Sequence, residues 1–148
     1  MKLKRGDIKM KIEEQVLSIE QMKHLQEFGV DTSDASMVWI KQDSTLLPDN
    51  IKELWWVDTY YDSLKPMVEQ EDSGFVQTYT IGDLIEKLPI RIGSVNRKIY
   101  FTGKYIIVSY SSPDGSLIEY RGTTLLCLLY SLLCWVAENH KELLEVKK

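Results

Sequence analysis

The chain has few of the residues from which disulfide frameworks and many catalytic sites are built. Its 148 residues include two cysteines and two histidines. Cys127 and Cys134 lie in a segment that we expect to be helical, about 10 Å apart along its axis, which is more than a disulfide allows. A disulfide scaffold is therefore excluded, and both cysteines are expected to be buried, reduced thiols.

A long apolar run is also missing. The longest extends from Leu125 to Ala137 and is broken by Ser131. This run is too short for a helix that must cross a hydrocarbon core of roughly 30 Å. The N-terminus carries charge but no apolar stretch typical of a secretory signal. We expect a cytoplasmic chain without membrane contact, with residues 1–10 as a loose N-terminal extension in which Met10 is an alternative start to Met1.

Common catalytic and nucleotide-binding motifs are absent as well. The sequence has no Walker A loop and no GxGxxG, GxSxG, HExxH or CxxC motif. His24 shares one helix face with Glu20 and Glu27, but no further ligand or nucleophile is marked, so we interpret this face as solvated. We expect no catalytic residue, no metal and no cofactor, and a protein that is not an enzyme.

The composition that is present is ordinary for a globular protein. Hydrophobic residues make up 44% and charged residues 27%, which predicts a single domain over residues 1–148. The formal net charge is −4, and it disfavours indiscriminate nucleic-acid binding. The charge is uneven, because residues 1–74 hold 9 basic and 15 acidic residues and residues 75–148 hold 9 and 7. Between Lys87 and Pro113 there are five basic residues and no acidic one.

Helix signals occur at three places. Ser18 precedes an apolar stripe, and Gln21 completes a capping box with it. Gly29 supplies the left-handed position that ends such a helix. Thr80 and Asp83 form a similar start. The predicted helices cover residues 19–28, residues 81–88, and a long last segment from 125 to at least 138.

Segments rich in β-branched and aromatic residues lie between these helices. We predict strands at residues 37–41, 54–61, 75–79, 97–102, 104–110 and 117–121, and a loop at 63–74. The last three strands form a meander around Gly103 and the turn at 113–115. The order of elements predicts an α+β fold. Its antiparallel sheet is covered on one face by an N-terminal helix and a long C-terminal helix, with one short helix in addition.

The last predicted helix is apolar around nearly its whole circumference. Such a helix lies either at the centre of its domain or under a second chain. Both alternatives stay open, and the second favours a homodimer or a protein partner. We expect Met22, Leu25 and Phe28 to share a core with the apolar residues of this helix, which are Leu125, Leu128, Leu129, Leu132, Trp135 and Val136.

A cluster of aromatic residues lies in the strand predicted at 54–61. Trp55 and Tyr61 would point to one face of this strand, and Trp56 and Tyr60 to the other. We expect one pair to belong to the core and the other to face outward or into a partner. These four residues are the candidate partner-binding site.

The basic segment at 87–113 provides an alternative function. Basic and aromatic side chains together on a sheet are typical of proteins that bind single-stranded nucleic acid. The same aromatic residues are ordinary strand formers, and the register of the hairpin decides whether they share a face with the basic residues. The candidate nucleic-acid-binding residues are Arg91, Arg97, Lys98, Tyr100, Lys104 and Tyr105.

Three segments together carry a resemblance. They are LSIEQMKHLQ at 17–26 with the following GVDTS and ASM, YTIGDLIEKLP at 79–89, and LYSLLCWVAEN at 129–139. They resemble uncharacterised small proteins encoded in prophages and mobile elements of gut bacteria such as Bacteroides. The resemblance covers about a third of the chain and implies a bacterial or phage cytoplasmic setting, without assigning an activity. We therefore expect a small accessory protein that binds a protein partner or itself, with single-stranded nucleic-acid binding as the alternative.

Overall fold

The structure is a computed structural model, and it describes residues 14–51 and 53–144. The extension expected at residues 1–10 lies outside the described residues. The helices are α1 (Ile19–Glu27), α2 (Lys65–Glu69), α3 (Ile81–Lys87) and α4 (Leu125–Asn139), and the short 3₁₀ helices are η3 (Ser44–Leu46), η4 (Asp62–Leu64) and η5 (Lys141–Leu144). The strands are β1 (Met37–Lys41), β2 (Trp55–Thr59), β3 (Phe75–Thr78), β4 (Arg91–Ile92), β5 (Val95–Phe101), β6 (Ile106–Ser112) and β7 (Gly115–Gly122).

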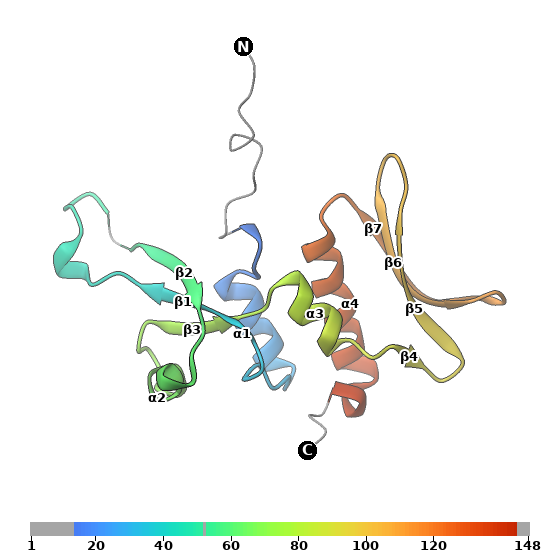
Figure 1. Ribbon diagram of the computed structural model, residues 1–148, viewed down its shortest axis with the longest axis horizontal. Helices are drawn as coiled ribbons and strands as arrows, with labels where there is room; N and C mark the ends of the chain where they lie inside the picture. The colour runs from blue at the N-terminus through green and yellow to red at the C-terminus, as the bar shows by residue number, and fades with distance from the viewer. Residues whose placement is uncertain (1–13, 52, 145–148) are drawn as a thin grey trace, which may run out of the picture.

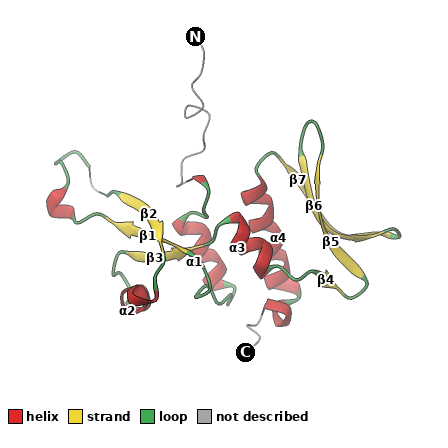
Figure 2. Ribbon diagram, in the orientation of Figure 1, coloured by secondary structure: helices red, strands yellow, loops and turns green. Residues whose placement is uncertain are grey.

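The predicted α+β class is confirmed, with the strands divided between two antiparallel sheets. One sheet has the strand order β2-β1-β3 and the other has the order β4-β5-β6-β7. Helices α1, α3 and α4 stand between the two sheets (Figure 1, Figure 2). The meander predicted near the C-terminus is β5-β6-β7, and the short strand β4 extends it at one edge.

Local hydrogen bonds explain where α1 begins and ends. The Ser18 hydroxyl accepts from the backbone of Gln21 at 3.1 Å, and the Gln21 side chain accepts from the backbone of Ser18 at 2.9 Å. At the other end Gly29 adopts a φ of 81°, and the amide of Val30 donates to the carbonyl of Leu25 at 3.0 Å. This is the reciprocal cap and Schellman closure that the sequence predicts.

The sequence predicts a loop at 63–74, and this prediction is wrong for the first part of the segment. Residues 65–69 form the short helix α2, with Pro66 in the first turn. Proline is accepted there because the amide that it lacks would have no partner inside the helix. The acidic stretch that follows reaches a left-handed turn at Asp72 and Gly74 before β3 begins.

Helix α4 lies at the centre of the molecule. It packs against α1 and α3 on one side and against β6 and β7 on the other. Its buried residues are Leu126, Leu128, Leu129, Leu132, Leu133, Val136 and Ala137, while Leu125 and Trp135 are partly buried against the same core. Met22 and Leu25 join this core, and Phe28 packs at its margin. Of the two alternatives for the apolar helix, the structure therefore has the central one.

One side of α4 faces solvent, and it corrects the prediction for Cys127. Cys127 is exposed and Cys134 is partly exposed, whereas both were expected to be buried. Cys127 and Glu138 are exposed on this side of the helix, and Cys134, between them in the sequence, is partly buried against the core. The leucines around Cys127 suggested burial, but they occupy the other sides of the helix.

Candidate binding site

The chain between α3 and β4, residues 88–90, is held by hydrogen bonds to three successive carbonyls. Arg97 on β5 donates through its guanidinium to the carbonyl of Leu88 at 3.0 Å and through its backbone amide to that of Ile90 at 2.8 Å. Tyr110 on β6 donates to the carbonyl of Pro89 at 2.7 Å. The same guanidinium also donates to the carbonyl of Ile85 near the end of α3 at 2.6 Å. Two side chains of the sheet thereby fix the backbone of this connection.

The side chain of Ile90 projects from this fixed backbone into solvent. It is 76% exposed, the largest value among the large hydrophobic residues that the structure describes. An aliphatic side chain on a rigid backbone loses little conformational freedom when a partner covers it. Ile90 is therefore suited to act as an anchor for a bound molecule.

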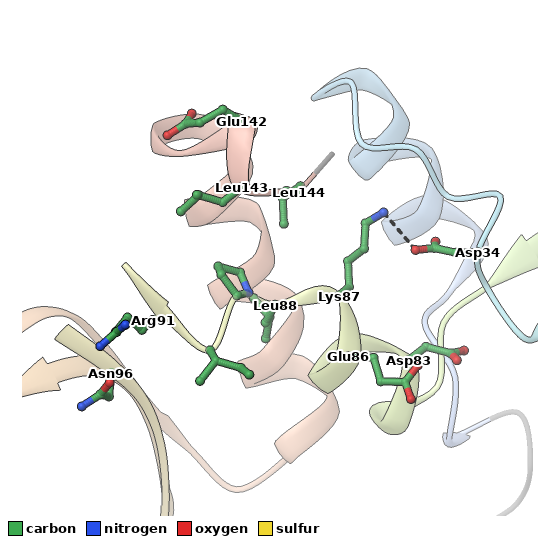
Figure 3. A pocket seen from close by; sticks show the side chains of 12 residues that line it. Asp34, Asp83, Glu86, Lys87, Leu88, Arg91, Asn96, Glu142, Leu143 and Leu144 are labelled. Carbon is green, nitrogen blue, oxygen red and sulfur yellow. Dashed lines mark hydrogen bonds and ion pairs between the residues drawn. The ribbon is translucent and has the colours of Figure 1, made fainter. Parts of the chain in front are cut away.

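Ile90 lies on the wall of a cavity of about 1100 Å³. The other walls come from the loop at Asp34, from α3, from Asn96 on β5 and from η5 with Leu143 and Leu144 (Figure 3). Leu143 is 42% exposed, so a second aliphatic side chain is available there. The volume is slightly above the usual range for small-molecule pockets and is sufficient for a segment of a peptide.

An ion pair between the buried side chain of Lys87 and the exposed side chain of Asp34 forms one end of this cavity. The side chain of Lys87 is only 5% exposed, and its ammonium group donates to Asp34 at 3.0 Å and to the carbonyl of Asp31 at 2.9 Å (Figure 3). The second carboxylate oxygen of Asp34 accepts from the hydroxyl of Tyr79 at 2.6 Å. Burial and the adjoining Asp34 raise the pKa of Tyr79, so its hydroxyl stays protonated and remains a donor. The ammonium group of Lys87 is thus already used in contacts within the chain.

The remaining charges around the cavity are mostly negative. Asp83 accepts from the backbone and hydroxyl of Ser36 and from the backbone of Thr80, so it is engaged in capping α3. Glu86 is exposed, and Glu142 is exposed with its carboxylate 3.8 Å from Nδ1 of His140. Arg91 is exposed and forms no ion pair with any residue that the structure describes.

The six residues considered for nucleic acid do not share one face of the four-stranded sheet. Arg91, Lys98 and Tyr100 share the face turned away from α4. Residues 96, 98 and 100 are every second residue of β5 and lie on one face, and Arg91 joins them because it pairs with Asn96. Arg97 points to the opposite face, where it holds the carbonyls described above. Lys104 lies in the turn between β5 and β6.

Arg121 belongs to the same outer face, although the sequence does not mark it as a site residue. Its guanidinium lies 5.6 Å from the centre of the Tyr105 ring and pairs with Glu119 at 2.9 Å. Arg121 stands opposite Ile107, which stands opposite Tyr100. The outer face therefore combines basic and aromatic side chains, but only the cross-strand register reveals which ones.

The aromatic residues at 55–61 do not separate into a buried and an exposed pair. Strand β2 ends at Thr59, so the alternation does not continue to Tyr60 and Tyr61. Trp56 is 38% and Tyr61 is 63% exposed, and each comes from a different expected pair. Trp55 donates to Glu53 at 2.9 Å, and the ammonium group of Lys41 lies 6.0 Å from its ring.

His24 has a partner that the sequence does not indicate. Its Nδ1 atom lies 2.6 Å from the hydroxyl of Tyr130 on α4, and its ring contacts that of Phe28. Burial raises the pKa of the nearby Cys134, which keeps this thiol protonated rather than nucleophilic. Within residues 14–51 and 53–144, no three potential metal ligands of the His, Cys, Asp and Glu types come together.

Comparisons with known proteins add no relative. No protein-family model, curated protein or solved structure matches the chain. Among the described helices, none has both the length and the apolar character needed to cross a bilayer.

Proposed function

We propose that the chain is a small binding protein that holds a segment of a protein partner in the cavity beside Ile90. The observation that carries this proposal is the exposure of Ile90 above a backbone whose carbonyls are fixed by Arg97 and Tyr110. Residues that dominate protein interfaces are anchors of this kind, preorganised and able to be fully covered. Complete burial of an isoleucine side chain contributes about 1.5–3 kcal/mol.

The function proposed is binding without catalysis, in a bacterial or phage cytoplasmic setting. The absence of catalytic motifs from the sequence supports the first part. The resemblance to proteins of prophages and mobile elements supports the second. The absence of catalysis and the bacterial or phage setting stay predictions, and the test of peptide binding depends on neither.

Selection of short random peptides on the full chain tests the proposal. Peptides enriched on the natural chain are screened again on Ile90→Asp and on Leu46→Asp. Leu46 is a matched control, because it is an exposed aliphatic residue on η3, outside the cavity. We expect enriched peptides that lose binding with Ile90→Asp and keep it with Leu46→Asp. If both variants retain every enriched peptide, or if none is enriched, the proposal is wrong.

A specific observation also favours the alternative function. Lys98, Tyr100 and Arg121 lie on one open face of the four-stranded sheet, where bases could stack on the aromatic rings and phosphates could meet the basic groups. Labelled single-stranded DNA and RNA are titrated at low and physiological salt. Binding that weakens steeply with salt and is lost in Lys98→Glu would establish this function. Absence of binding at low salt would remove it.

A further inference from the structure

The charges around Ile90 indicate what kind of partner segment fits the cavity, an inference that rests on the proposed function. We propose that the segment is cationic and apolar, with a lysine or arginine beside an aliphatic or aromatic anchor. Ile90 and Leu143 offer the apolar contact from two walls of the same cavity. The charge of the segment follows from the carboxylates that remain available.

Two carboxylates at the cavity are available to a cation. Figure 3 shows Glu86 on α3 and Glu142 on η5 at different sides of the cavity. No ion pair between Glu86 and a described cation exists, and the contact of Glu142 with His140 is 3.8 Å long. A cation reaching either side would therefore gain a new ion pair without first breaking a strong one.

The positive groups at the cavity compete poorly for an anionic segment. Lys87 is buried and already bound by Asp34 and by the carbonyl of Asp31. Arg91 is the remaining cation among the lining residues, and its single positive charge is outnumbered by the two carboxylates of Glu86 and Glu142. The formal net charge of −4 also attracts a cationic partner at long range. Charge complementarity thus favours a basic segment over an acidic or phosphorylated one.

Substitutions that remove charge but preserve shape test this inference. The probe is the tightest Ile90-dependent peptide from the selection, measured by fluorescence anisotropy against the natural chain and the variants Glu86→Gln and Glu142→Gln. Glu138→Gln is the matched control, because Glu138 is an exposed carboxylate on α4 outside the cavity. Each cavity variant is expected to weaken binding by about 2- to 5-fold, as exposed ion pairs do, and the control is expected to leave it unchanged.

The composition of the peptides separates this inference from the proposed function. Ile90-dependent peptides rich in lysine and arginine, with affinity that falls as salt rises, support both. Ile90-dependent peptides that carry no excess positive charge and respond equally to all three glutamine variants leave the proposed function standing and overturn the inference. A selection in which no peptide depends on Ile90 overturns the proposed function itself.

Discussion

The four-stranded and three-stranded sheets differ in how they use their apolar residues. The inner face of the four-stranded sheet is covered by α4, and Val108 and Tyr110 are fully buried there. The three-stranded sheet buries Val38 and Val57 apart from the core around α4 and leaves Trp56 and the nearby Leu54 exposed. The four-stranded sheet also leaves large side chains exposed, which are Tyr100, Phe101 and Leu117.

Helix α4, the most apolar helix of the chain, is covered by α1, α3, β6 and β7 of the same chain. Ile90, the most exposed of the large hydrophobic side chains that the structure describes, extends instead from a backbone held by Arg97 and Tyr110.

The largest effect should follow from opening the centre of the molecule. Leu132 on α4 is fully buried, so Leu132→Ala leaves a cavity and should lower the free energy of unfolding by ~2–5 kcal/mol. Urea denaturation measures the change, and Glu20→Ala on the exposed face of α1 should stay within about 0.5 kcal/mol. Equal midpoints for Leu132→Ala and the parent would contradict the central position of α4.

A matched pair of neighbours sharpens the contrast between the two faces of β5. Arg97→Met leaves the carbonyls of Ile85 and Leu88 without their donor and should cost about 1–3 kcal/mol of unfolding free energy. Lys98→Met, on the outer face, should cost no more than about 0.5 kcal/mol. Similar losses for the two variants in urea would show that Arg97 does not fix the connection beside Ile90.

Alkaline pH should destabilise the chain through its buried tyrosines. Burial raises the pKa of Tyr79 and Tyr110 above the ordinary value of 10.0. Below pH 10 the folded and unfolded states both keep these protons, so the free energy of unfolding does not change through these tyrosines. Above it only the unfolded state loses them, so each tyrosine removes about 1.4 kcal/mol per pH unit until the folded-state pKa is reached.

Urea midpoints measured from neutral to strongly alkaline pH test this loss. Tyr110→Phe should show a shallower decline with pH than the parent. Tyr61→Phe, at an exposed position, should follow the parent. A parent chain whose stability does not fall above pH 10 would show that these hydroxyls are accessible to solvent in the folded state.

The smallest effect on stability is expected at the proposed anchor itself. Ile90 makes little contact with the rest of the chain, so Ile90→Asp should change the urea midpoint by no more than about 0.5 kcal/mol in free energy. A larger loss would mean that Ile90 supports the fold, and its exposure would then not explain a loss of peptide binding.

Features set by neighbouring residues could be predicted from the sequence. The caps at Ser18 and Thr80 and the glycine closure at Gly29 depend on atoms a few residues apart, and they appear as expected. The division into two sheets was not predicted, because β1 pairs with both β2 and β3 across long loops. Strand β4 has two residues, too few for a pattern to show.

The candidate site was less accessible to prediction than the fold. Ile90 is a single aliphatic residue after Pro89, and no periodicity distinguishes it from a core residue. The roles of Arg97 and Lys98 separate only once the register of β5 against β6 is known. The contact of His24 with Tyr130 joins residues 106 positions apart, a distance over which spacing carries no information.

Mapping a bound peptide on the chain by NMR is the decisive test of binding beside Ile90. The tightest peptide from the selection is added to the isotope-labelled full chain, and shifts of the backbone amides are followed. Binding in the cavity should place the largest shifts on Lys87, Leu88, Ile90, Arg91, Asn96 and the amides of η5. Shifts centred on Trp55–Thr59, or on Lys98 and Tyr100, would place the partner on another surface and contradict it.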